Sequence, residues 1–120
     1  MKRAVILRHT LPDGSWHYDW LVQRSANPDD LVPTFRTDQT RPDQSGSFEA
    51  EQIGDHRALY LDHEGEVSGG RGEVARIVTG EVRSATWADD YIGFEIRYPG
   101  EVIVYLGEHL GSGRWNFTTR

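Results

Sequence analysis

Short runs of alternating apolar and polar residues, separated by glycine and proline, occupy most of this chain. Residues 3–9 read Arg-Ala-Val-Ile-Leu-Arg-His, so a strand here points Val5, Leu7 and His9 to one side. Successive side chains of a strand point to opposite faces, so Ala4 and its alternate partners face the other way. The pattern predicts a first β-strand that carries a histidine near its end.

A tight turn and a second strand are expected to follow. Residues 11–14 are Leu-Pro-Asp-Gly. In such a turn proline presets the backbone, aspartate bonds to its own backbone, and glycine accepts a positive φ. Residues 16–22, Trp-His-Tyr-Asp-Trp-Leu-Val, are predicted to be the returning strand. A hairpin centred on Asp13 then places His9 roughly opposite His17.

The pattern is weakest from 25 to 55, where three prolines interrupt it. We expect a short strand at 31–36, a helical turn near 48–53 with Ser47 as its N-cap, and otherwise loop. Alternation is strong again after residue 56. The strands predicted there are 57–65, 72–80, 81–88, 91–98, 101–107 and 113–120.

This succession of short strands indicates a mainly β protein with little helix. A length of 120 residues corresponds to one domain, spanning residues 1–120. An antiparallel sheet with this many strands tends to close, because closure removes its edges. The sequence therefore predicts a small antiparallel β-barrel of about eight strands.

Composition narrows the possible chemistry. The chain has no cysteine, so any metal site must use histidine, aspartate or glutamate. A net charge of −6 argues against broad binding of duplex nucleic acid but permits a local phosphate site built from a few arginines. No run is long and apolar enough for a membrane span, and the start of the chain lacks the features of a signal peptide. We expect a cytoplasmic protein without a membrane partner.

His17-Tyr18-Asp19 is the sharpest local motif. On a strand, His17 and Asp19 share one face with Cα atoms about 6.5–7 Å apart. With His9 across the hairpin, the three side chains can converge on one cation and leave positions open for water or substrate. The same residues also suit the wet face of an ordinary surface strand, and spacing alone leaves that interpretation open.

Two further motifs could contact phosphate. In an extended segment His56 and Tyr60 would share a face, where they could bind or protonate a phosphate oxygen. Residues 64–72 are rich in glycine, which allows backbone N–H groups to form an anion nest around Arg71. A capped turn and a solvated hairpin loop are the alternatives. His63 has the opposite strand parity and is left outside the predicted site.

The ordered set of motifs resembles the phosphoesterase domain of bacterial DNA ligase D and its small stand-alone relatives. That family has a strand ending in His, then H-Y-D, then D-H with a Tyr four residues later, then E-G and a Gly-rich hairpin. Here these motifs stand at His9, His17–Asp19, Asp55–His56, Tyr60, Glu64–Gly65 and 68–72, and residues 113–120 resemble the family's last strand.

The resemblance implies a β-barrel hydrolase that uses a divalent metal, typically manganese, and removes 3′-phosphate or 3′-ribonucleotide from DNA ends in repair. By position it implies that His9, His17 and Asp19 are the metal ligands and that His56 and Tyr60 act at the scissile phosphate. DNA 3′ ends and DNA repair proteins are the implied partners.

One departure from the family keeps two other interpretations open. Where ligase-linked members carry an arginine that clamps phosphate, this chain has Leu21. The first alternative is a catalytically weak module that binds phosphate or nucleic-acid ends. The second is a phosphoesterase for a small metabolite, which an acidic surface tolerates better than a long polyanion.

Overall fold

Nine strands and one short helical segment make up the fold, seen in a computed structural model that describes residues 1–120. The strands are β1 (Arg3–Thr10), β2 (Trp16–Val22), β3 (Val32–Thr37), β4 (Ser47–His56), β5 (Gly65–Glu66), β6 (Glu73–Trp87), β7 (Tyr91–Tyr98), β8 (Glu101–Gly111) and β9 (Arg114–Thr119). The 3-10 helix η1 covers Ala58–Leu61.

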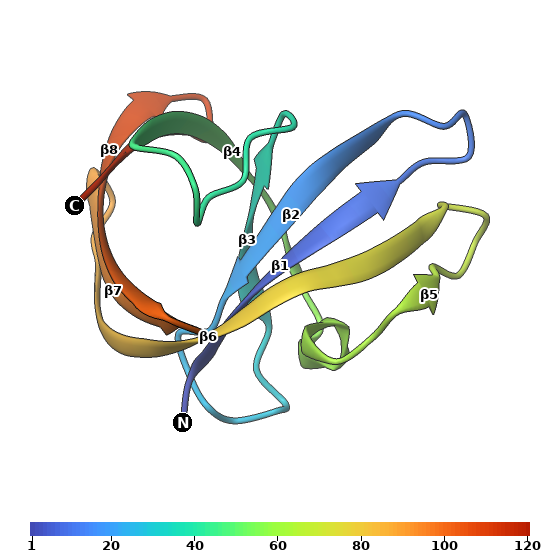
Figure 1. Cartoon of the computed structure of the whole chain (residues 1–120), viewed down its shortest axis with the longest axis horizontal. Helices are drawn as coiled ribbons and strands as arrows, with labels where there is room; N and C mark the ends of the chain where they lie inside the picture. The colour runs from blue at the N-terminus through green and yellow to red at the C-terminus, as the bar shows by residue number, and fades with distance from the viewer.

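Eight of these strands close into an antiparallel barrel (Figure 1). Their order is β1-β2-β3-β4-β9-β8-β7-β6, and pairing of β6 with β1 completes the circle. β5 lies outside the circle and pairs with β6. The predicted fold class, a small antiparallel β-barrel of about eight strands with little helix, is confirmed.

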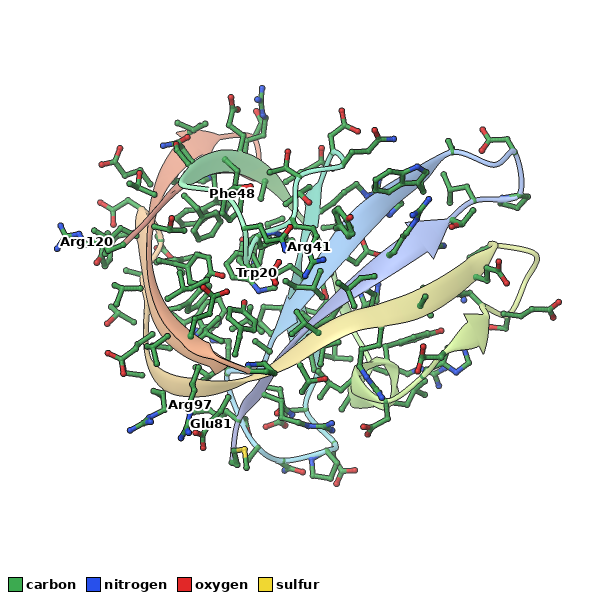
Figure 2. All side chains as sticks on the ribbon, viewed as in Figure 1. Trp20, Arg41, Phe48, Glu81, Arg97 and Arg120 are labelled. Atoms are coloured by element: carbon green, nitrogen blue, oxygen red, sulfur yellow. The ribbon has the colours of Figure 1, made fainter.

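Aromatic side chains fill the barrel. Trp20 is fully buried at the centre, with the rings of Phe35, Phe48, Phe94, Tyr105 and Phe117 around it. The centroid distances to these rings lie between 4.7 Å for Tyr105 and 5.8 Å for Phe48. Figure 2 shows Trp20 and Phe48 inside the ring of strands. The interior is therefore a packed core, and a functional site must lie elsewhere.

A second, smaller apolar cluster covers the outer face of β1 and β2. Its buried members are Val5, Leu7, Leu21, Val32, Leu61, Val67 and Val74. Leu61 belongs to η1, and Val67 to the loop that follows β5. Residues 57–72, named here the cover segment, therefore pack on the outside of the barrel wall. Both faces of β1 are buried as a result.

The predicted hairpin is confirmed. His9 pairs with His17 in the β1–β2 register. In the turn the Gly14 N–H donates to the Leu11 carbonyl at 2.9 Å, and Gly14 has a φ of 89°. Glycine adopts this left-handed conformation without the steric cost that other residues meet. The expected strand at 31–36 is also present, displaced by one residue as β3.

The helical turn expected near 48–53 is wrong. Ser47 begins the ten-residue strand β4, which pairs with β9 and then β3. Phe48 and Ala50 alternate into the barrel core while their neighbours are exposed. Period-two burial in a closed sheet outweighs the local capping signal of one serine, because pairing on both sides satisfies the backbone.

The region after β4 also differs from expectation. Residues 57–65 are not a strand: they form η1 and the connection to β5. Residues 72–88 hold one continuous strand, β6, instead of two. At Gly80 a Cβ would lie 2.8 Å from Ile96 Cγ2, so glycine permits a close strand contact there and makes no turn. No helix in the structure has the length and apolar character needed to span a bilayer.

Candidate functional site

Three side chains from the β1–β2 hairpin converge on the outer face of the barrel. The His9 Nδ1 atom lies 3.4 Å from Asp19 Oδ2, and the His17 Nε2 atom lies 3.2 Å from Asp19 Oδ1. The three candidate ligand atoms all lie within 4.8 Å of one another. Cross-strand pairing brings His9 beside His17, and the two-residue period puts Asp19 on the same face. The predicted juxtaposition is present.

The cluster is shielded from solvent yet incompletely bonded. The Asp19 side chain is only 3% exposed and the His17 side chain 9%. His17 Nε2 and Asp19 Oδ1 are both buried without a hydrogen-bond partner, because their 3.2 Å contact lacks hydrogen-bond alignment. Buried polar atoms are rarely left in this state, since each costs about 1–3 kcal/mol. The arrangement indicates a missing partner at this point.

The electrostatics favour a charged carboxylate here. Burial by itself would raise the pKa of Asp19, but the imidazoles of His17 and His9 outweigh it and lower that pKa to about 2. In return the Asp19 carboxylate raises the pKa of His9, with burial acting in the opposite direction. An anionic oxygen flanked by two imidazole nitrogens is a donor set that suits a divalent transition metal.

The donor spacing also fits a cation. For metal bonds of about 2.0–2.2 Å, as in zinc sites, neighbouring ligand atoms lie about 3.0–3.6 Å apart. The two separations to Asp19, 3.4 and 3.2 Å, fall in this range, and the ligand atoms of His9 and His17 lie within 4.8 Å of each other. Two neutral imidazole nitrogens that face a carboxylate as acceptors repel it unless a proton or a cation lies between them. His9, His17 and Asp19 therefore fit the metal that the motifs imply.

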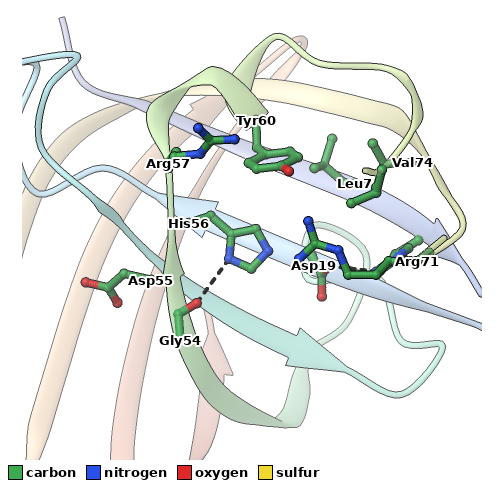
Figure 3. A pocket seen from close by; sticks show the side chains of 11 residues that line it. Leu7, Asp19, Gly54, Asp55, His56, Arg57, Tyr60, Arg71 and Val74 are labelled. Carbon is green, nitrogen blue, oxygen red and sulfur yellow. Dashed lines mark hydrogen bonds and ion pairs between the residues drawn. The ribbon is translucent and has the colours of Figure 1, made fainter. Parts of the chain in front are cut away.

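A pocket of about 380 Å³ opens beside this cluster, between the barrel wall and the cover segment (Figure 3). It is lined by Leu7, His9, Asp19, Gly54, Asp55, His56, Arg57, Tyr60, Val67, Arg71 and Val74. His9 and Asp19 form one part of the wall. The predicted phosphate-contacting residues His56, Tyr60 and Arg71 all line the same pocket. All the predicted site residues except His17 are thus in the lining, and His17 adjoins it through Asp19.

His56 and Tyr60 meet by a route that differs from the expected extended segment. His56 ends β4, and Tyr60 lies on η1. Their rings pack edge to face with centroids 5.6 Å apart. The His56 Nδ1–H donates to the Gly54 carbonyl at 3.0 Å, which leaves Nε2 free. The 3-10 turn shortens the chain, so residues four apart still lie side by side.

Arg71 lies in the glycine-rich loop that returns from β5 to β6. Its Nε donates to the Ser68 carbonyl at 2.7 Å, and an Nη atom lies 3.3 Å from Ser68 Oγ. These bonds use part of the guanidinium and leave other N–H groups available. Figure 3 shows the Arg71 side chain among the residues that line the pocket. The loop thus brings a cation to the pocket that His9 and Asp19 also line.

Sequence reasoning missed two residues of this region. Arg57 lines the pocket, and its position directly after Asp55-His56 was the available signal. His63 was excluded on strand parity, which does not apply in a helical turn. Its ring packs against Tyr60 with centroids 5.6 Å apart, and its Nε2–H donates to the Glu66 carbonyl at 2.7 Å. His63 therefore packs against Tyr60 without lining the pocket itself.

The position that departs from the family motif is also explained by packing. Leu21 is fully buried in the outer apolar cluster. Its place beside Val5 and Leu7 leaves no room for a solvated cation. In the pocket itself the arginines are Arg57 and Arg71, and both come from the cover segment.

No family model matches this chain, and no curated protein matches it either.

Proposed function

We propose that this protein is a metal-dependent phosphoesterase, with manganese as the expected metal, that removes 3′-phosphate or 3′-ribonucleotide from DNA ends in repair. The observation that carries the proposal is the buried His9–His17–Asp19 cluster. Its unpartnered Asp19 Oδ1 and His17 Nε2 atoms adjoin a pocket whose other polar side chains, His56, Tyr60 and Arg71, are of the types that bind phosphate. The order of the H-Y-D, D-H and glycine-rich motifs supports DNA ends as the substrate class.

His9, His17 and Asp19 would hold the metal. A divalent cation bound there supplies Lewis acidity toward a phosphoryl oxygen and acidifies a water molecule. The protein's own contribution is the fixed donor set, which the hairpin holds before any ligand arrives. Because Asp19 stays ionised, the site retains one negative charge to attract the cation.

The other pocket residues would bind the phosphate. Arg71 can donate its free guanidinium N–H groups to non-bridging oxygens, and the Tyr60 hydroxyl can add another donor. His56 is held by the Gly54 carbonyl with Nε2 free, so an imidazolium at this position can donate to an oxygen. Such donors stabilise the charge that develops in the transition state.

In the hydrolysis step a water oxygen bonds to phosphorus while the bond from phosphorus to the 3′ oxygen breaks. The departing 3′ oxygen takes a proton, which His56 is positioned to supply as a general acid. The water loses its proton to solvent. The products are a DNA 3′-hydroxyl and inorganic phosphate, with no oxidant or further reactant required.

The test is release of inorganic phosphate from a 3′-phosphorylated primer with Mn²⁺, comparing wild type with His17→Ala. We expect a rate loss of at least 100-fold in the variant, and loss of wild-type activity with a chelator. His109→Ala is the matched control, because His109 lies on β8 outside the pocket, and it should retain full activity. Equal activity in His17→Ala and wild type would overturn the proposal.

A second candidate is favoured by the buried Leu21. Without a cation at that position, the pocket could bind a phosphorylated end without turning it over. In that case the primer would bind with Mn²⁺ but release no phosphate. A third outcome, fast hydrolysis of small phosphate monoesters with no inhibition by oligonucleotides of increasing length, would instead indicate a small metabolite as the substrate.

A further inference from the structure

The glycine-rich loop lies unusually close to the end of β1. Gly72 has a φ of 91°, and a Cβ built on it would lie 2.0 Å from the Thr10 carbonyl oxygen and 3.0 Å from Leu11 Cα. Both atoms belong to the backbone, so no side-chain rotation could relieve the clash. The loop is closed by the Val67 N–H, which donates to the Gly72 carbonyl at 2.8 Å. Only glycine at position 72 permits this approach.

This close approach brings the backbone carbonyl of Arg71, a hydrogen-bond acceptor, against the ring of His9, a candidate metal ligand. The Arg71 carbonyl oxygen lies 2.7 Å from His9 Nε2. A carbonyl can only accept, so the ring must carry its proton on Nε2. In the neutral ring the lone pair is then on Nδ1. This nitrogen lies 3.4 Å from Asp19 Oδ2, on the side of the ring that faces the cluster.

We propose that the loop Ser68–Gly72 is a positioning element that fixes the tautomer of His9, and that Gly72 is the residue that makes it possible. The Arg71 carbonyl holds the Nε2 proton and turns the Nδ1 lone pair toward Asp19 and His17. The inference rests on the metal site of the proposed function and does not depend on the reaction. Outer partners of this kind typically affect metal affinity by about 10–100-fold.

The competing arrangement shows why the tautomer matters. If His9 carried its proton on Nδ1, that proton would point at Asp19 and occupy the space where a cation would bind. The cluster would then be a closed His–Asp hydrogen bond. The Arg71 carbonyl acts against this state, because the Nδ1–H tautomer would leave Nε2 and that carbonyl facing each other as two acceptors, whereas a cation at the cluster removes the corresponding repulsion between Nδ1 and Asp19. Docking of the loop thus favours a cluster that can bind a metal over one that is only a hydrogen-bonded His–Asp pair.

Two-bond ¹⁵N–¹H correlation of histidine-labelled wild-type protein loaded with Zn²⁺, a diamagnetic d¹⁰ ion, tests the first part. With Zn²⁺ bound we expect His9 to carry its proton on Nε2, where the Arg71 carbonyl accepts it, with Nδ1 unprotonated. An Nδ1–H pattern for His9, or no binding of Zn²⁺, would overturn the inference. This measurement needs no variant, so a folding defect cannot obscure it.

Gly72→Ala and Gly70→Ala test the role of the close approach. Both glycines lie in the loop with positive φ, at 91° and 68°, but a Cβ at Gly70 meets nothing within 4 Å. Titration with Mn²⁺ alone should show affinity about 10–100-fold weaker in Gly72→Ala and a much smaller change in Gly70→Ala. His9 in Gly72→Ala should lose the uniform Nε2–H pattern. Equal losses in the two variants would overturn the role of Gly72.

These results are separable from those on the reaction. A protein with the Nε2–H tautomer and Gly72-dependent Mn²⁺ binding but no phosphate release supports the loop inference and overturns the proposed activity. A protein that releases phosphate with Mn²⁺ while His9 carries its proton on Nδ1 does the reverse.

Discussion

The two faces of the β1–β2 hairpin are both buried, but the inner face packs in the barrel core and the outer face carries the polar cluster. The inner face contributes Trp20 and its neighbours to a core of 17 residues closed by strands from the whole barrel. The outer face contributes to a cluster of only 7, covered by a short helix and a glycine-rich loop. Stability is concentrated where packing is aromatic and closed. The polar cluster lies where a thin cover leaves a pocket.

The difference also explains how charged groups are tolerated. Asp19 is adjacent in sequence to Trp20, yet its side chain points to the opposite face. A carboxylate in the aromatic interior would meet no compensating charge and would carry a large desolvation cost. On the outer face it is buried between two imidazoles. A shift of one residue in strand register would therefore move the Asp19 carboxylate into the apolar core, where no opposite charge would offset its burial.

The largest loss of stability is expected from a substitution on the inner face. Trp20→Ala should lower the free energy of unfolding by about 3–5 kcal/mol, because it removes the side chain that five aromatic rings surround. Urea denaturation followed by circular dichroism measures this. Trp16→Ala, at the half-buried rim, should cost less. Equal costs would contradict the assignment of Trp20 to the centre.

Breaking the outer face should have a smaller effect on stability. Leu61→Ala is expected to cost about 2–3 kcal/mol, because Leu61 is 1% exposed and joins η1 to the outer cluster. The same denaturation experiment measures this, and phosphate release should fall as Tyr60 loses its support. Leu59→Ala is the control: it lies on the same helix but is 47% exposed, so its cost should stay within about 0.5 kcal/mol.

Stabilisation of the fold by bound Mn²⁺ should distinguish substitutions on the outer face from those on the inner face. At a free Mn²⁺ concentration 100 times the Kd, wild type should gain about 2.7 kcal/mol of stability by mass action. Asp19→Asn should lose this gain, because a neutral amide replaces the central carboxylate. Trp20→Phe should keep it despite lower stability. Thermal denaturation with and without Mn²⁺ checks this, and a full gain in Asp19→Asn would remove that residue from the metal site.

The smallest expected effect concerns an exposed ion pair at the border of the cover segment. Arg3 Nη1 lies 2.7 Å from Asp62 Oδ1 and lowers the pKa of that carboxyl. A lowered folded pKa means that the pair stabilises the fold above the unfolded pKa and loses this contribution as pH falls through the folded value. Because Asp62 is largely exposed, solvent screening limits the contribution to at most about 0.5 kcal/mol.

Urea denaturation of wild type and Asp62→Asn, both in chelator, tests this pair. The variant should be slightly less stable at neutral pH, and the difference should vanish well below pH 3.8, the ordinary value for this carboxyl. High salt should shrink the difference in the same way. A difference that persists unchanged in acid would assign the effect to packing instead of charge.

Local features of the site could be predicted from the sequence. The turn at 11–14 and the two-residue period of its flanking strands are enough to bring His9, His17 and Asp19 to one face. That prediction spans only a few residues on each side of the turn, so loop closure costs little. By contrast, β4 was predicted as a helical turn, because its pairing with β9 joins segments more than sixty residues apart.

Tyr60 and His63 illustrate the same limit within the pocket. Strand parity groups His56 with Tyr60, which do lie together although the segment is not extended, and it leaves out His63. Leu61 packs in the outer cluster and the chain around it forms η1. This turn brings the ring of His63 against that of Tyr60. No local pattern gave this turn, because the surface that stabilises it is built from β1, β2 and β3.

Local sequence is enough to set which side chains of the hairpin share a face, because the two-residue period of a strand and the tight turn depend only on residues that are close in the chain. It could not determine which face of β1 is interior, since residues 4–7 are apolar on both sides. Closure of β1 against β6 decided that, and docking of the cover segment then made the pocket. Both steps depend on contacts between distant segments, whose energy exists only once the barrel has formed.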